Sequence, residues 1–265
     1  DRQAGFYGLD VYSLGASIEA VLLYLDRVDP EAAQVARQRY GCLAPWRAEP
    51  ARYGHMAMSR GYAVCEKPVT DALLDLLHNR LGYLAKDGDA FFDAEQNARI
   101  VTAAEQYYRI MYYGNAQSWN LRDQHMFDTL ERVLANRGSD SKAIVWAHNS
   151  HIGDAEFTDM GQVRGELNIG QLARARFGDD CALIGFGTDR GTVAAASNWD
   201  EPMEIKRVRP ARNDSYEGRS RDAGLDAFFL ETGPDQKTSV RDALAEPLLE
   251  RAIGVIYRPE TELLS

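Results

Sequence analysis

The sequence contains only three cysteines, Cys42, Cys65 and Cys181, and they form no Cys-x-x-Cys pair. An odd number of widely spaced cysteines argues against a disulfide framework and against a cysteine-based zinc site. It favours free thiols in a reducing compartment. We therefore expect a cytoplasmic protein with no metal bound through cysteine.

Long apolar runs and an excess of positive charge are also lacking. No stretch approaches the roughly 20 apolar residues of a membrane span, and Lys and Arg number 30 against 40 Asp and Glu, which gives a net charge of −10. This balance predicts no binding to nucleic acid or to an anionic membrane. The one basic run, residues 206–212 (KRVRPAR), is interrupted by Pro210 and is interpreted as a solvated loop.

A Gly-x-Ser-x-Gly turn, internal repeats and low-complexity segments are absent as well. The missing turn argues against a nucleophilic serine of the α/β-hydrolase kind. No signal peptide is present, and the sequence starts at Asp1 without an initiator Met, so we expect residues upstream of it in the natural protein.

The most informative stretch is residues 142–154 (KAIVWAHNSHIGD). Its apolar run, residues 143–146, is short and rich in β-branched and aromatic residues, which predicts a buried strand. His148, Asn149 and His151 follow that strand, at the end where open α/β sheets place ligands. The two histidines can line one pocket; alternatively, one caps a helix and the other packs against Trp146.

The first half of the chain has mostly helical periodicity. A short strand at residues 4–10 ends in Asp10, which is interpreted either as a turn residue or as a pocket residue. Residues 13–137 then form a helical portion, with helices expected from Ser13, from Pro30, and over residues 68–86, 91–113 and 115–137. Residues 41–61 are expected to be a loop that either covers a site or is fixed to the core by its aromatic side chains.

In the second half of the chain, predicted strands alternate with predicted helices. Strands are predicted at residues 181–187, 227–230 and 253–257, an extended segment at 192–197, and helices at 167–177 and 243–251. Alternating strands and helices favour an α/β fold with a mainly parallel central sheet flanked by helices and carrying a large helical insertion. We expect one domain over residues 1–265, with a helical portion at 13–137 and an α/β portion at 142–260.

Four segments together resemble the erythromycin esterase family: FYGLDVYSL at residues 6–14, SWNLRDQHM at 118–126, VWAHNSHIGD at 145–154 and IGVIYRPETE at 253–262. The similarity spans essentially the whole chain. It is greatest to an actinobacterial branch in which such a domain can be joined to a phosphoribosyltransferase-like domain, so a covalently linked domain of that kind is an expected partner.

The resemblance implies a hydrolase that opens ester or lactone bonds with an activated water, without a metal or other cofactor in its best-known members. The family's His-Asn-x-His element falls on His148, Asn149 and His151, and its Arg-Asp element falls on Arg122 and Asp123. Its general-base histidine belongs to a Gly-Glu-Ala-x-His-Gly motif upstream of the segment that matches residues 6–14. These 265 residues do not contain that motif, so we expect a chain trimmed at both ends and weak or inactive by itself.

The working hypothesis follows from what ester hydrolysis requires, namely a group that takes a proton from water and groups that stabilise the oxyanion. His148 and His151 would polarise or orient water and carbonyl, Arg122 would stabilise negative charge, and Asp123 or Asp10 would hold a partner in place. Two alternatives are a metal-dependent hydrolase, using the histidines with Asp10 or Asp154, and a non-catalytic regulatory domain. By itself, an Arg-Asp dipeptide on a helix is more often solvent-facing than catalytic.

Overall fold

The computed structural model describes residues 4–60, 62–199, 201–233, 236–260 and 262. The ends of the expected single domain and Gly61, at the end of the expected 41–61 loop, lie outside these residues. The chain divides into two compact units. Unit 1 comprises Asp1–Ala147 and His151–Leu183, and unit 2 comprises His148–Ser150 and Ile184–Ser265. The expected single domain stays a prediction.

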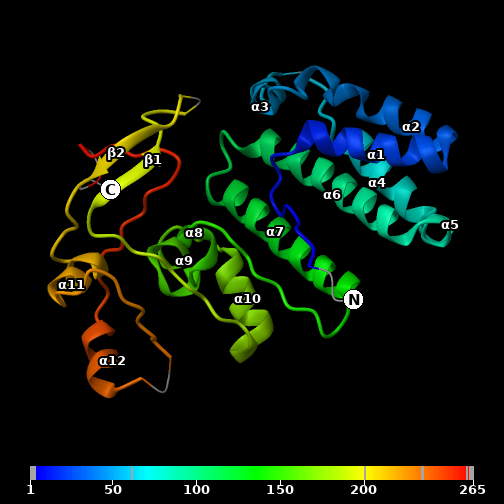
Figure 1. Cartoon of the computed structure of the whole chain (residues 1–265). Coiled ribbons are helices and arrows are strands. Elements are labelled where there is room, and N and C mark those ends of the chain that lie inside the picture. The colour runs from blue at the N-terminus through cyan, green and yellow to red at the C-terminus, as the bar shows by residue number, and fades with distance from the viewer. Residues whose placement is uncertain (1–3, 61, 200, 234–235, 261, 263–265) are drawn as a thin grey trace. The chain divides into compact units, whose positions relative to one another are not determined.

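Unit 1 is built from helices, and most of them gather into one bundle (Figure 1). They are α1 (Leu14–Val28), α2 (Pro30–Tyr40), η1 (Gly41–Trp46), α3 (Pro50–Ala57), α4 (Glu66–His78), α5 (Arg80–Lys86), α6 (Gly88–Ile110), α7 (Ala116–Arg137), η2 (Ala155–Phe157), α9 (Asp159–Gln162), α10 (Ile169–Phe177) and η3 (Gly178–Asp180). The short helix α8 (Asn149–Ile152) crosses the boundary between the units in sequence.

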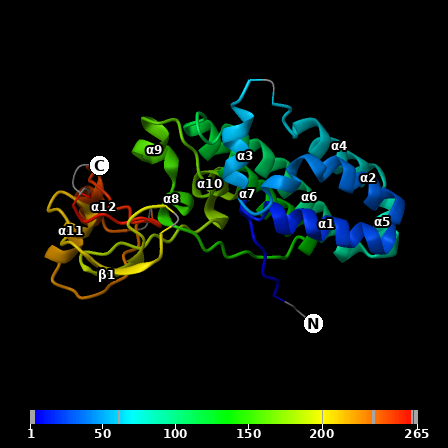
Figure 2. The same cartoon turned by 90° about the horizontal axis from the view of Figure 1, so that it is seen from above.

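The bundle forms because the apolar residues of its helices recur on one face. In α1 the buried side chains include Leu14, Ile18, Val21 and Leu25, at the spacing that puts them on one stripe. Helix α6 packs against α1, α3, α4 and α7, and the two views agree on its central place among the helices (Figure 2). Helices therefore make up most of residues 14–137.

The helix ends depend on local side-chain hydrogen bonds, and two of the expectations are corrected. Asp29 caps α2, since its carboxylate accepts a hydrogen bond from the Ala32 N–H at 3.0 Å and Pro30 opens the helix. Ser13, the expected cap of α1, instead shares a hydrogen bond with the hydroxyl of Ser17. The helix expected over residues 68–86 is two helices that meet at Asn79, whose side-chain amide donates to the Asp75 carbonyl and competes with the helical pattern.

The expected loop at residues 41–61 is largely helical and is fixed to the core. Tyr53 is fully buried, and its hydroxyl donates to Glu105 at 2.5 Å and accepts from the backbone N–H of Cys65 at 2.8 Å. Cys42 and Cys65 form a disulfide, while Cys181 is free. The expectation of free thiols is thus wrong for Cys42 and Cys65. These two residues are 23 apart in the sequence, and the turn of the chain through η1 and α3 brings them together.

The described residues contain no central parallel sheet. The strands are β1 (Gly191–Ala195) and β2 (Glu204–Val208), which pair antiparallel in unit 2, and Ala196 adds a parallel bridge to Ile256. Segments 4–10, 143–146, 181–187 and 227–230 are not strands, and the segment expected as a strand at 253–257 makes only the single bridge at Ile256. A run of strand-forming residues becomes a strand only when a second chain segment offers its N–H and C=O groups in register, and the pattern of one segment does not specify that partner.

Alternation nevertheless survives in residues 144–147. Val145 packs with the cluster of Met126, Phe127, Leu130, Ile169 and Ala173, which joins α7 to α10. Its neighbours Ile144 and Trp146 are 95% and 90% exposed. Side chains that alternate between core and solvent have the period of a strand. The segment therefore covers the helices with one face only.

Unit 2 also contains α11 (Tyr216–Asp222) and α12 (Thr238–Leu244). Ser215 caps helix α11 by accepting a hydrogen bond from the Gly218 N–H. The helix predicted over 243–251 ends at Leu244 instead, because Pro247 disfavours helical geometry at the residue before it. The basic run 206–212 is not simply a loop, since its first three residues end β2.

Candidate active site

The centre of the candidate site in unit 1 is a buried pair, Asp123 and His151. Asp123 lies on α7 and is fully buried, and its carboxylate oxygens lie 2.9 and 3.0 Å from Nδ1 of His151. The same carboxylate accepts a hydrogen bond from the backbone N–H of Ile169, where α10 begins. Two elements of unit 1 therefore converge on one carboxylate.

This geometry determines the tautomer of His151. An ionised carboxylate can only accept hydrogen bonds, so Nδ1 of His151 carries the proton and Nε2 presents a lone pair. No residue in the described part of the chain bonds to Nε2. The ring is also held by Trp119, which stacks on it with centroids 4.7 Å apart and an interplanar angle of 2°. The indole N–H of Trp119 is bonded in turn to the Leu167 carbonyl.

A second ion pair in unit 1 joins Arg122 to Asp10. The Nε and Nη2 of Arg122 donate to the two carboxylate oxygens of Asp10 at 2.8 and 2.6 Å. The guanidinium carbon lies 4.6 Å from the centre of the Tyr12 ring, and the Tyr12 hydroxyl is 3.0 Å from that of Tyr107. A bidentate pair over an aromatic face is a rigid arrangement. It leaves Nη1 with no hydrogen bond to the described residues.

The two carboxyl groups have opposite pKa shifts. Burial raises the pKa of Asp123, and the hydrogen bonds from His151 and Ile169 offset this only in part. Burial also acts to raise the pKa of Asp10, but the hydrogen bonds and charge of Arg122 outweigh it and bring the pKa below its ordinary value. The charges of Arg122 and His151 both lower the pKa of Asp10, so the two pairs interact electrostatically.

A glycine permits the close packing behind His151. Gly170, in the first turn of α10, lies against the carbonyls of Ile152 and Gly153, and a Cβ at this position would be 2.0 Å from the Gly153 oxygen. That distance is far inside any real contact. The chain after His151 is therefore seated on the start of α10, which holds the histidine near Asp123.

His148 and Asn149 belong to unit 2 and have other partners. Nε2 of His148 donates to the Ile253 carbonyl at 2.7 Å, and its Nδ1 accepts from the Ser150 N–H at 3.2 Å. The side chain of Asn149 bonds to both backbone groups of Phe186, as a neighbouring strand would. Both ring nitrogens of His148 are thus engaged, in contrast to His151.

Glu250, which the sequence interpretation missed, lies beside Asn149. The Asn149 amide is 3.4 Å from its carboxylate. Burial and the charge of Glu217 raise the pKa of Glu250, against the opposing effect of Asn149 and His148. One carboxylate oxygen of Glu217 is buried and has no hydrogen-bond partner. Unit 2 therefore has a small acidic group around the His148 segment.

The structure brings four of the six predicted site residues together in unit 1, as the pairs Asp10–Arg122 and Asp123–His151, and it places His148 and Asn149 in unit 2. The pocket expected to be shared by the two histidines stays a prediction. Sequence reasoning missed Trp119, although it precedes Asp123 by four residues on one helix and so shares its face.

The described residues also bear on metal binding and on membrane-spanning helices. In the part of the chain that the structure describes, no three His, Cys, Asp or Glu side chains are grouped as metal ligands would be. Asp154, considered as a ligand in the metal-dependent alternative, has one buried carboxylate oxygen without a hydrogen bond. None of the described helices has the length and apolar character that crossing a membrane requires.

Known proteins that are similar to this chain align with most of its length. The family model of the erythromycin esterases matches residues 1–265, so the chain belongs to the erythromycin esterase family. A solved Bacillus cereus protein is similar with a TM-score of 0.74 at 18% identity, over 96% of this chain and 60% of that one.

Two other solved structures have the same general fold. One is a mutant of the erythromycin esterase EreC in its open conformation, with a TM-score of 0.64 at 18% identity over 82% of this chain and 57% of that chain. The other is a succinoglycan biosynthesis protein, with a TM-score of 0.61 at 19% identity over 82% of this chain and 50% of that chain. The chain thus spans 50% to 60% of the length of these proteins.

Proposed function

We propose that this chain provides the His151–Asp123 part of a hydrolase that cleaves ester or lactone bonds of a small-molecule substrate by water attack. The proposal rests chiefly on one observation. A histidine whose Nδ1 is bonded to a buried carboxylate leaves its Nε2 lone pair unbonded among the described residues, in a chain of the erythromycin esterase family.

His151 is the proposed proton acceptor. When Nε2 takes a proton from water the ring becomes positively charged, and Asp123 stabilises that charge across the Nδ1 hydrogen bond. Trp119 keeps the ring in the plane that this bond requires. His151 would accordingly make the water nucleophilic, while Asp123 orients the ring.

Arg122 is the proposed group for the oxyanion. Attack on an ester carbonyl moves negative charge to its oxygen, and a preorganised cation lowers the barrier to that step. Asp10 and Tyr12 hold the guanidinium by one edge and one face. Its remaining Nη1 is the donor we assign to the developing charge. His148 and Asn149 are proposed to orient water and carbonyl as supporting residues.

The 265-residue chain is expected to be weak or inactive by itself, because a second histidine base, which the family resemblance implies in addition to His151, belongs to a motif absent from these residues. Losing such a base costs about 10²- to 10⁴-fold in rate. The test compares the natural full-length protein with the 265-residue chain on p-nitrophenyl esters and on a macrolide lactone. Full activity of the 265-residue chain would show that no second base outside these residues is needed. A full-length protein that cleaves neither substrate class would argue against the hydrolase.

Metal independence and a linked phosphoribosyltransferase-like domain stay predictions. Dialysis of the active full-length protein against a chelator, with metal content measured before and after, distinguishes the two hydrolytic mechanisms. Unchanged activity after metal removal supports attack by water that His151 activates. Activity lost with the metal and restored by its return would favour the metal-dependent alternative instead.

A further inference from the structure

Unit 2 contains a hollow that plays no part in the proposed hydrolysis. It has a volume of about 710 Å³ and is lined by three segments of the chain. These are Ser197 and Asn198 after β1, residues 206–210 at the end of β2, and residues 258–260. All of them belong to unit 2, so the hollow is a feature of that unit alone.

Backbone and side-chain bonds hold the three walls together. Ala196 N–H donates to the Val255 carbonyl and Tyr257 N–H donates to the Ala196 carbonyl, which fixes the third segment beside the first. The hydroxyl of Tyr257, a buried residue, accepts from the Arg209 N–H at 3.1 Å and ties in the second. The hollow is therefore formed before any ligand arrives.

The lining of the hollow is rich in positive charge. Its described residues include the four cations Lys206, Arg207, Arg209 and Arg258 and a single acid, Glu260. In a protein of net charge −10, such a local excess of cations is unusual. Positive side chains that converge on a concave surface raise the local concentration of anions.

Two of these arginines are not neutralised by carboxylates. Arg209 donates to the Pro259 carbonyl at 2.9 Å, which is a neutral acceptor. Neither it nor the exposed Arg207 has an ion pair within the described ranges. Lys206 is paired with Glu204 at 3.4 Å. Arg258 is held by the Ser197 carbonyl and by the Asn198 side chain at 2.9 and 2.7 Å.

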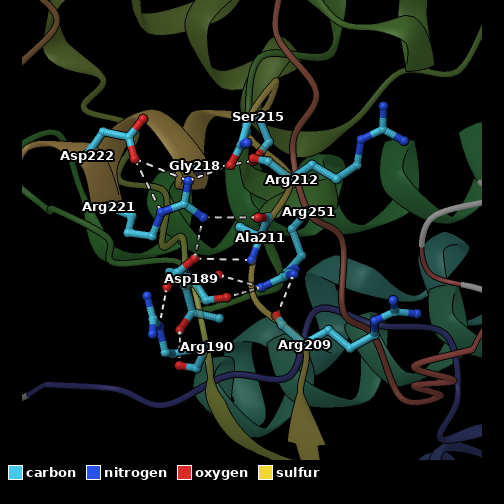
Figure 3. Close-up of polar contacts among 12 residues, drawn as sticks. Asp189, Arg190, Arg209, Ala211, Arg212, Ser215, Gly218, Arg221, Asp222 and Arg251 are labelled. Carbon is cyan, nitrogen blue, oxygen red and sulfur yellow. Dashed lines mark hydrogen bonds and ion pairs between the residues drawn. The ribbon is translucent and has the colours of Figure 1, made fainter.

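Other arginines of unit 2 are paired with carboxylates. Figure 3 shows Arg221 bonded to Asp189 and Asp222, and Arg190 is paired with Asp189 as well. Arg251 pairs with Glu262. These cations are used inside the unit to tie segments together, whereas the Arg209 side chain extends away from that network in Figure 3. The contrast indicates that the hollow keeps charge available for a ligand.

We propose that this hollow binds a small, multiply charged anion, such as a di- or triphosphate. Guanidinium groups from separate segments can each give two parallel hydrogen bonds to one phosphate group. Ser197 and Asn198 add polar side chains to the lining, and the volume accommodates more than a single phosphate. The site is separate from the proposed hydrolytic residues and requires none of them.

The test is calorimetric titration of the 265-residue chain with inorganic pyrophosphate, tripolyphosphate, citrate and acetate at low salt. We expect dissociation constants of about 1 mM or below for the multiply charged anions and much weaker binding of acetate. Binding should weaken as salt is raised, because screening acts on exposed charges. Phosphates that bind tighter than citrate identify phosphate as the ligand chemistry, and the reverse order identifies a polycarboxylate.

Variants locate the binding. The double variant Arg207→Gln/Arg209→Gln should weaken pyrophosphate binding by about tenfold. The matched control Arg212→Gln/Arg219→Gln removes two exposed arginines of the same unit outside the hollow and should bind as the wild type does. Arg207→Gln alone serves as the mildest change, since its side chain has no ion pair or hydrogen bond within the described ranges. Circular dichroism verifies that each variant is folded.

Several results would overturn the proposal. One is the absence of binding by any multiply charged anion up to about 10 mM. Equal affinity in the hollow variant and in its control is a second. A third is binding of a single-stranded oligonucleotide without binding of the small anions, which would identify an extended nucleic-acid surface instead.

Discussion

His148 and His151 are three residues apart, yet their ring nitrogens are used differently. Nδ1 of His151 is bonded to Asp123, whereas both nitrogens of His148 are bonded within unit 2 to Ile253 and the Ser150 segment. A histidine acts as a base through an unshared lone pair, so these rings are not equivalent. The difference favours His151 as the proton acceptor.

This distinction is testable in the active full-length protein. His151→Gln should lower kcat by about 10²- to 10⁴-fold, the usual effect of removing a base. His148→Gln should cost less, since glutamine can still bond to the Ile253 carbonyl. Both are measured with a p-nitrophenyl ester, with circular dichroism as the folding control. Equal losses in the two variants would contradict the assignment of the base to His151.

The Asp10–Arg122 pair predicts a pH effect on stability. The folded-state pKa of Asp10 lies below its ordinary value, so its contribution is present above the unfolded pKa, about 3.9, and is lost as pH falls through the folded one. Asp10→Asn should therefore be less stable than the wild type near pH 6, with the difference shrinking toward pH 3. Urea unfolding at a series of pH values measures it.

A control sharpens that experiment. Asp222→Asn removes an exposed carboxylate of unit 2 that pairs with Arg221 on the surface. Exposed pairs contribute little, so its curve should follow the wild type at every pH. A constant gap between Asp10→Asn and the wild type across the pH series would show that Asp10 acts by packing rather than by charge.

At the scale of elements, the segment from Gly41 to Cys65 behaves as part of the core rather than as a free loop. Tyr53 is buried against Glu105, and Trp46 donates to the Tyr62 hydroxyl at 3.0 Å. The Cys42–Cys65 disulfide closes the segment at its ends. A cover that opened over a ligand would have to break these contacts.

The disulfide predicts both a thiol count and a stability change. The folded chain should show one reactive thiol to a thiol reagent, Cys181, and three after reduction in denaturant. The double variant Cys42→Ser/Cys65→Ser should lose about 3 kcal/mol of unfolding free energy. Without the disulfide the unfolded chain regains the conformational entropy of a loop of this length. Urea unfolding measures the loss. Added reductant should destabilise the wild type but leave the variant unchanged; three reactive thiols in the folded chain would contradict the pairing.

Across the whole molecule, the two units differ in how much apolar core supports them. Unit 1 contains the large helical cluster that includes Leu14, Phe91 and Val101, whereas the buried apolar cluster of unit 2 consists of Ala195, Val208 and Tyr257. Local opening costs little where few apolar contacts are lost. Unit 2 should therefore open more readily than unit 1.

Hydrogen exchange measures this difference directly. Amides of the β1–β2 ladder should exchange at least about 100-fold faster than those in the middle of α6. The comparison is internal to one sample, so solution conditions cancel. Equal protection in the ladder and in α6 would show that the chain unfolds as one cooperative unit, in line with the single domain that the sequence predicts.

The sequence by itself determined the long helices α1, α6 and α7 and the residue types of the site. The apolar stripes of α1, α6 and α7 and the caps at Asp29 and Pro30 depend on neighbours within one or two turns, so local pattern is sufficient. Asp10, Arg122, Asp123 and His151 were likewise found from motifs.

Only the tertiary structure decided which groups meet. Asp123 and His151 are 28 residues apart, and Arg122 and Asp10 are 112 apart, distances over which no periodicity carries information. The expected parallel sheet does not occur in the described residues for the same reason, since pairing depends on the partner segment and not on the run of residues 143–146. Local chemistry fixes helices and caps, whereas pairing, the Cys42–Cys65 bond and the tautomer of His151 depend on contacts between distant parts of the chain.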